Sequence, residues 1–206
     1  ITLEKAGLPG EGRVFKDENE ALMAYERREI TLHTRIAIPV RSFRHKIFPD
    51  IYMDKYLVTT PGKLIFNGIF PDSFQYINDG STENIEKITP SKYFLDKGTN
   101  IPEAIKEMPL VEPFVKGTFV KLIAQVYKRY QTTETSIMLD KLKDLGFKHS
   151  TLSGISISVA DLMESKTKKE VVTKSQKKVD TINKQFKRGL ITEDERYEKV
   201  VEIWTN

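Results

Sequence analysis

The side chains best suited to acid–base or metal chemistry near neutral pH are three histidines, His33, His45 and His149. They lie far apart in the sequence, and no cysteine or paired aspartate stands at a spacing typical of a metal site. Each histidine is therefore expected to be structural, with a ligand role as the less favoured alternative. We predict no catalytic residue and no metal ligand in this chain.

Phosphate binding and nucleophilic catalysis also lack their usual patterns. The glycines within residues 7–12 are interrupted by Pro9 and are not followed by Lys-Ser or Lys-Thr, so they do not predict a phosphate-binding loop. No serine stands at the centre of a nucleophile-elbow pattern. The sequence alone therefore indicates no catalytic machinery.

A basic run in the last third of the chain is the strongest charge feature. Its members are Lys166, Lys168, Lys169, Lys174, Lys177, Lys178, Lys184, Lys187 and Arg188. Such a run fits a nucleic-acid contact, but a solvated helix face is the commoner cause. The charge alone does not decide between them.

A turn between two helices is predicted directly after this run. Gly189 has no Cβ and can adopt the left-handed conformation that ends a helix. Thr192 can cap the next helix through its hydroxyl group, with Glu195 completing a capping box. Glu193 and Asp194 place negative charge at the positive end of the new helix dipole. We therefore predict a C-terminal helical hairpin.

The expected seam of this hairpin follows the coiled-coil spacing of three and four residues. On the first helix the seam residues are Val172, Ser175, Val179, Ile182 and Phe186. On the second helix they are Tyr197, Val201 and Trp204, which we expect to pack back on the first helix.

The N-terminal part is expected to mix short strands with a helix. Asp17 to Arg28 predicts a helix capped by Asp17, and Ile30 to Val40 predicts strands, with Pro39 at an edge or strand end. Leu57 to Thr60 is another strand candidate, and residues 60–62 form an expected turn before a helix.

The remaining segments are expected to be irregular first and helical afterwards. Residues 71–113 show little periodicity, apart from one short helix near 102–108. Residues 117–130 and 133–145 predict two amphipathic helices, the second ending at Gly146. Residues 153–159 alternate serine with β-branched residues and predict a strand or extended segment.

Composition sets the outer limits. A chain of 206 residues with 39% hydrophobic content can bury a core, in one domain or two. Its net charge of +4 is compatible with polyanionic partners but does not require them, and the lack of cysteine suits a reducing cytosol. No apolar stretch is long enough to span a bilayer, and no signal peptide opens the chain. Because the first residue is Ile1, we expect the chain to belong to a longer one.

Four stretches together resemble beta-prime, the largest catalytic subunit of bacterial multisubunit RNA polymerase. Residues 20–36 are similar to the segment that follows the active-site region of this family. Thr59 to Asn67 resembles its Thr-Thr-x-Gly-Arg-x-x-Phe-Asn signature, and Leu139 to Ile157 its run ending in Ser-Gly-Ile-Ser-Ile. Phe186 to Trp204 resembles its Gly-Leu-Ile-Thr-x-x-Glu-Arg-Tyr hairpin. All four occur in the family's order.

The resemblance implies a place in the secondary channel, through which nucleotides reach the active centre. It implies that residues 1–70 belong to the pore of this channel and residues 117–160 to its funnel. It also implies that the hairpin is the channel rim, where transcript-cleavage-type coiled-coil factors dock. The implied docking residues are Arg196, Tyr197, Lys199 and Glu202. The implied channel-wall residues are Lys63, Ser153, Gly154 and Ser156.

The resemblance also implies cofactors and partners. Mg²⁺ would be bound outside this chain, because the family's Asn-Ala-Asp-Phe-Asp-Gly-Asp loop is not in the sequence. The implied partners are the beta, alpha, omega and sigma subunits, with nucleoside triphosphates, DNA and RNA reached through the complex. The implied location is cytoplasmic and nucleoid-associated, without a membrane.

Three departures from the family pattern limit this transfer. Lys63 replaces the usual arginine, which removes bidentate hydrogen bonding. The segment after the Ser-Gly-Ile-Ser-Ile run keeps one acid, Asp161, where the family has a pair. Glu198 and Glu202 stand where many members carry Asn and Asp, and an added carboxylate would repel the regulatory nucleotide that some members bind there.

We therefore expect an α+β, mainly α fold in four segments. These are a pore-like α+β segment (1–70), an irregular connection (71–116), a helical funnel segment (117–160) and a rim hairpin (161–206). The expected function is part of DNA-directed RNA polymerase, a nucleotidyltransferase as the whole complex, whereas this chain alone should be inactive. The alternative is a free-standing basic coiled-coil adaptor that binds nucleic acid or protein.

Overall fold

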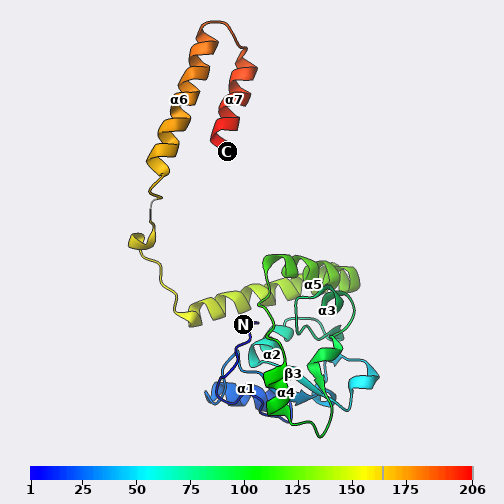
Figure 1. The fold of residues 1–206 in the computed structure, drawn as a ribbon. Coiled ribbons are helices and arrows are strands. Elements are labelled where there is room, and N and C mark those ends of the chain that lie inside the picture. The colour runs from blue at the N-terminus through cyan, green and yellow to red at the C-terminus, as the bar shows by residue number, and fades with distance from the viewer. Residues whose placement is uncertain (164, 206) are drawn as a thin grey trace. The chain divides into compact units, whose positions relative to one another are not determined.

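A computed structural model describes residues 1–163 and 165–205. It has two compact units, Ile1–Gly154 and Ile155–Asn206 (Figure 1). Helices far outweigh strands, and the strands lie in the N-terminal unit, so the predicted α+β, mainly α class is confirmed. The division into four segments stays a prediction.

A small antiparallel sheet lies at the centre of the first unit. Strands β1 (Ile36–Pro39), β3 (Tyr56–Thr59) and β5 (Phe94–Leu95) run in the order β1-β3-β5. Ile36 pairs with Thr59, and Leu57 pairs with Phe94. The predicted strand at 57–60 is confirmed, as is the position of Pro39 at the end of an edge strand. The expectation of more than one strand within 30–40 was wrong, because residues 30–35 form turns and an isolated bridge.

Two short helices pack beside this sheet. Helix α1 (Glu18–Glu26) is capped as predicted, with the Asp17 carboxylate accepting from the Glu20 N–H. Helix α2 (Pro61–Asn67) begins directly at Pro61, so the expected turn is the helix start itself. Thr60 caps α2, and its hydroxyl oxygen accepts from the Lys63 N–H at 3.2 Å.

The segment 71–116 is more regular than expected. The predicted helix is α4 (Ile101–Glu107), but α3 (Thr82–Glu86) also forms, as does a two-strand parallel pair of β2 (Lys46–Ile47) and β4 (Phe74–Gln75). This segment also contains a short 3₁₀ turn at Ser91–Tyr93. Two more 3₁₀ turns come earlier in the chain, at Val40–Ser42 and Asp50–Tyr52. Three of the Asn and Asp residues that suggested irregularity, Asn78, Asp79 and Asn84, are buried hydrogen-bonding groups.

Helix α5 (Lys116–Ser153) consists of two helical arms joined at Gln131, whose φ of 63° and ψ of −163° are not helical. Both arms belong to one apolar cluster, which contains Leu122 and Val126 from the first arm and Met138 from the second. The predicted pair of helices is therefore confirmed, but Gly146 does not end the second one. That helix continues to Ser153 and ends at Gly154, whose φ of +64° is left-handed.

Three apolar clusters stabilise the first unit. The largest joins α1, β1, β3 and β5, and its aromatic rings include Phe43, Phe48, Tyr76 and Phe94. The second joins α2, α3 and α5. The third joins β1, β3 and α4. Tyr76 and Phe74, which lie in the segment expected to be irregular, are almost fully buried in these clusters.

The second unit contains a 3₁₀ turn, η4 (Val159–Asp161), and helices α6 (Lys168–Lys187) and α7 (Glu193–Thr205). Residues 155–158 lie outside helix and strand. Helices α6 and α7 run side by side in opposite directions, so the predicted hairpin is confirmed (Figure 1).

Candidate functional site

The hairpin is the first candidate site, and its turn forms as the sequence predicts. Gly189 has a φ of +72°, and its N–H donates to the Phe186 carbonyl at 2.8 Å. Thr192 and Glu195 form the reciprocal capping box: each backbone N–H donates to the other's side chain, at 3.1 and 3.3 Å. The turn therefore fixes where α7 begins.

The seam of the hairpin follows the prediction in the middle of α6 and differs from it at the ends of α6 and on α7. Val179 is buried, and Ser175 and Ile182 are half-buried, as expected. Val172 and Phe186, expected in the same seam, are 46% and 38% exposed. On α7, however, Arg196, Val200 and Ile203 are the half-buried positions. Their spacing of four and three residues defines a helix face one position earlier than predicted.

The residues expected inside the seam are instead exposed. We call Tyr197, Val201 and Trp204 the α7 stripe; they are 66%, 45% and 51% exposed. The prediction was wrong because Arg196, which is half-buried, takes the seam position that the pattern assigned to Tyr197. Its guanidinium group lies 5.5 Å from the centre of the Phe186 ring and pairs with Glu193.

The predicted docking residues divide into two kinds. Arg196 is half-buried and held by Glu193 and Asn183, so it maintains the hairpin. The hydrogen bond from Arg196 lowers the pKa of Glu193. Tyr197, Lys199 and Glu202 are exposed residues of α7, so among the predicted docking residues these three offer surface.

Charge differs between the two helices of the hairpin. Most charged residues of α6 are basic, and most of those of α7 are acidic. The exposed acidic residues of α7 are Glu193, Asp194, Glu195, Glu198 and Glu202. Because the hairpin presents both signs, its surface is less uniformly basic than the α6 sequence alone indicates.

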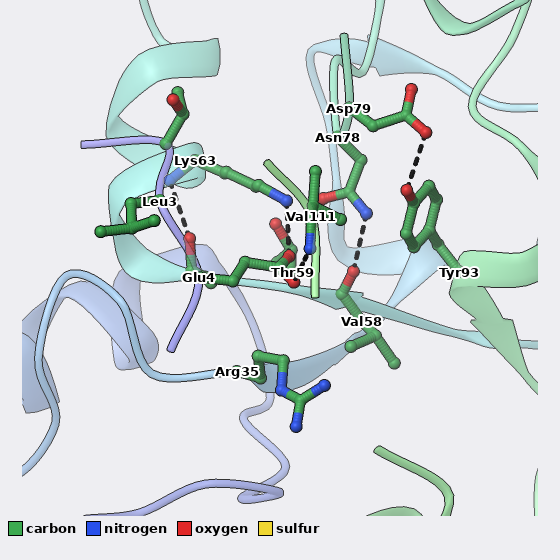
Figure 2. A network of polar contacts seen from close by, with 12 residues as sticks. Leu3, Glu4, Arg35, Val58, Thr59, Lys63, Asn78, Asp79, Tyr93 and Val111 are labelled. Atoms are coloured by element: carbon green, nitrogen blue, oxygen red, sulfur yellow. Dashed lines mark hydrogen bonds and ion pairs between the residues drawn. The ribbon is translucent and has the colours of Figure 1, made fainter. Parts of the chain in front are cut away.

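A buried ion pair in the first unit is the second candidate site (Figure 2). The Lys63 Nζ lies 2.5 Å from the Glu4 Oε1, and the two side chains are 0% and 4% exposed. The other carboxylate oxygen of Glu4 accepts from the Val111 N–H at 3.0 Å. Glu4 thus joins three segments that lie far apart in the sequence.

Burial strongly affects the charge of Lys63. Desolvation lowers the pKa of its amine, and the Glu4 carboxylate opposes that shift. With no exposed surface, Lys63 directs its charge at Glu4 within the unit. The expected role of Lys63 as a channel-wall residue therefore has no support from its placement.

Polar side chains continue this network toward Tyr93 (Figure 2). The Asn78 amide donates to the Val58 carbonyl at 3.0 Å, and the Tyr93 hydroxyl donates to Asp79 at 2.7 Å. Burial alone would raise the pKa of Asp79, but hydrogen bonds from Ser81 and Tyr93 outweigh it, so that pKa is lowered. The Asn78 Oδ1 is buried with no hydrogen-bond partner among the described residues.

A cavity of about 440 Å³ adjoins this network. Asp79, Lys92 and Tyr93 form one wall, and the segment 109–113 covers it. The Lys92 Nζ lies 4.9 Å from the Tyr93 ring centre and 3.4 Å from Asp79, so the polar groups of this wall are already paired.

The other expected wall residues lie at the end of α5. Ser153 is its last residue, Gly154 ends it, and Ser156 follows in the segment outside helix and strand. All three are exposed. Their placement is compatible with a channel wall, which stays a prediction.

Within residues 1–163 and 165–205, no group of three His, Cys, Asp or Glu side chains could hold a metal ion. Over the same residues, no helix is both long and apolar enough to cross a membrane. His33 is half-buried, with its Nδ1 2.9 Å from the Leu3 carbonyl, as a structural histidine would be.

Comparison with known proteins was decisive for the family. Residues 1–162 match the family model for RNA polymerase Rpb1, domain 3. The chain belongs to the Rpb1 domain 3 family. This domain therefore includes all of the first unit and the start of the second.

Similarity extends beyond the Rpb1 domain 3 match to the hairpin. The DNA-directed RNA polymerase subunit beta' of Geobacillus kaustophilus is 53% identical over 205 residues, and that of Bacillus cytotoxicus is 53% identical over 207. The Bacillus subtilis subunit is 48% identical over 205 residues. Each comparison covers 100% of this chain and 17% of the relative, so the chain spans about a sixth of their length.

Proposed function

We propose that this chain is part of a DNA-directed RNA polymerase, where it forms a wall of the nucleotide-entry channel and carries a docking hairpin for regulators. The observation that carries the proposal is the identity of about half over the whole chain, hairpin included, to subunits named beta'. Nucleotide addition would then belong to the whole complex. The proposed partners are the beta, alpha, omega and sigma subunits.

The first unit suits a wall because its polar core is cross-linked. The Glu4 carboxylate holds Lys63 and the backbone of Val111, which are 59 and 107 residues away in sequence. Such long-range bonds resist local opening of a surface. The first unit would thereby position Ser153 and Gly154 rather than react with the nucleotide.

The hairpin suits a helical partner. The α7 stripe is an exposed apolar row at helical spacing, flanked by the charges of Lys199 and Glu202. A partner helix can bury such a row while charged residues at its sides select the partner. A coiled-coil transcript-cleavage factor is the proposed occupant.

Mg²⁺ is the proposed cofactor of the whole enzyme. When bound, it would supply the two-metal chemistry of nucleotide transfer. The described residues contain no donor set that fits it, so the residues of this chain are proposed to guide nucleotides only.

A docking experiment tests the hairpin. Polymerase assembled with the double variant Tyr197→Ala, Trp204→Ala should show a ratio of factor-stimulated to unstimulated transcript cleavage at least tenfold lower than wild type. Loss of two exposed aromatic anchors at about 2 kcal/mol or more each would account for this. The matched control Lys174→Ala, on α6, should keep the wild-type ratio. An unchanged ratio in the double variant would refute docking on the α7 stripe.

The alternative function, a basic adaptor, is supported by the exposed lysines of α6. Titration of the chain with duplex DNA at rising salt distinguishes this adaptor function from the polymerase function. Tight binding with a steep salt slope would favour the adaptor, because each phosphate contact releases counterions. We propose that the chain binds duplex DNA weakly. We also propose a cytoplasmic, nucleoid-associated location, which the chain would have as part of the polymerase.

A further inference from the structure

Residues 155–158, directly after α5, form an uncharged apolar segment that is exposed over its whole length. Ile155 and Ile157 are 80% and 82% exposed, and Val159 behind them is 85% exposed. No charged residue occurs from Ser150 to Ala160. Exposed apolar runs of this kind, rich in β-branched residues and lacking charge and proline, associate readily unless they are covered.

The backbone of this segment is also unpaired. Among the hydrogen bonds between described residues, none involves the backbone of Ile155, Ser156 or Ile157. Gly154 ends the helix before them, and Ser158 is extended, with φ of −101° and ψ of 154°. Figure 1 shows the extended trace between α5 and η4, in yellow. Unpaired N–H and C=O groups in an extended segment are a template for another strand.

One edge of the segment is free, and the other is partly used. Alternate residues of a strand direct their N–H and C=O groups to the same edge. The Ser158 N–H already donates to the Asp161 carboxylate at 2.8 Å, so the edge shared by Ser156 and Ser158 is partly occupied. The edge that carries the groups of Ile155 and Ile157 remains for pairing.

We propose that residues 155–158 add as a strand to an extended edge of the same polypeptide, at a place outside this chain. The inference rests on the proposed function, in which the chain is part of a longer subunit. Its relatives are about six times as long, since the chain covers 17% of each. A strand tethered on the same polypeptide has a high effective concentration, which favours it over a separate subunit.

This pairing predicts the face that the partner offers. Ile155 and Ile157 point to one side of the strand and Ser156 to the other. The partner strand should therefore continue an apolar layer on the isoleucine side, and only small polar groups are needed on the serine side. Backbone bonds would provide affinity, and the two isoleucines would fix the register.

Amide hydrogen exchange on the assembled polymerase tests the proposal, read at single residues. We expect the N–H groups of Ile155 and Ile157 to exchange about 100-fold more slowly than unstructured reference amides, and Ser156 to exchange freely. Ile157→Pro removes a paired donor, so protection of Ile155 should be lost. The matched control Ser156→Pro removes only an outward donor and should retain protection of Ile155.

Other outcomes would overturn the proposal. Free exchange at Ile155 and Ile157, or protection at Ser156 instead, excludes strand addition on this edge. A photoreactive residue at position 156 should cross-link to the same polypeptide, whereas a cross-link to another subunit refutes the assigned partner. If polymerase assembles and adds nucleotides while these amides exchange freely, the strand fails and the proposed function stands. If the chain is not recovered in a polymerase, the proposed function fails.

Discussion

Removal of the Glu4 carboxylate should strongly destabilise the first unit. In Glu4→Ala, the fully buried Lys63 amine loses its charged partner, and the Val111 N–H loses its acceptor. Breaking a buried pair from one side costs about 3–5 kcal/mol, because the remaining charge stays buried and uncompensated. Replacing both partners, in Glu4→Leu with Lys63→Met, should recover most of that loss. The residual cost should be about 1–3 kcal/mol for the orphaned Val111 amide.

Urea unfolding followed by far-ultraviolet circular dichroism measures these free energies. The single tryptophan, Trp204, lies in the second unit, so its fluorescence provides an internal control that should not change. Glu29→Ala is the matched surface variant, because the Arg13–Glu29 pair has a similar length but is 48% and 41% exposed. It should cost no more than about 1 kcal/mol. Equal losses in Glu4→Ala and Glu29→Ala would refute the reasoning.

Three further predictions concern backbone and pH. Gln131→Gly should raise the free energy of unfolding in a urea titration by about 1 kcal/mol, because the relief of positive-φ strain exceeds the added entropy of the unfolded chain. Gln131→Ala should bring no gain in the same titration. Gly189→Ala should lower the stability of the hairpin by about 1–2 kcal/mol, because Gly189 is in the left-handed conformation. Gly146→Ala, inside a helix with open space around it, should instead raise stability by roughly 0.5–1 kcal/mol. Equal effects of the two substitutions in thermal melts would contradict both predictions. Burial lowers the pKa of His33 below its ordinary 6.5. As the pH drops below 6.5, the unfolded chain therefore binds the proton before the folded chain does, and the free energy of unfolding should fall. His33→Gln should weaken this pH dependence, measured as the urea midpoint across that range.

Local sequence signals predicted the elements that depend on neighbours in the chain. The hairpin turn follows from Gly189, Thr192 and Glu195, which interact within seven residues and need no tertiary context. The Asp17 and Thr60 caps are equally local. Such signals state where a helix begins, and the structure agrees with them.

The register of α7 was missed because an arginine acts as a seam residue. A hydropathy pattern assigns Tyr197, Val201 and Trp204 to the inside, since it counts Arg196 as polar. In the structure Arg196 is half-buried at that place, with its guanidinium group over the Phe186 ring. The capping box fixes where α7 begins, but which face of α7 is buried also depends on how α7 packs against α6.

The polar network of the first unit could not be predicted from spacing. Glu4, Lys63 and Val111 meet only in the folded chain, and single sequences do not show such pairs. The segment 71–113 was expected to be irregular because its Asn and Asp residues usually mark loops. Here Asn78 and Asn84 are buried and bond backbone groups, which replaces regular secondary structure.

The most direct test of the channel role uses the absence of native cysteine in this chain. Ser153→Cys in a polymerase without other reactive cysteines can be labelled with a bulky maleimide, with Glu29→Cys as the labelled control. The label at position 153 should raise the KM for nucleoside triphosphates several-fold and leave kcat nearly unchanged, because it narrows the entry route without touching the reacting atoms. An unchanged KM at full labelling would contradict the placement of this chain in the channel wall.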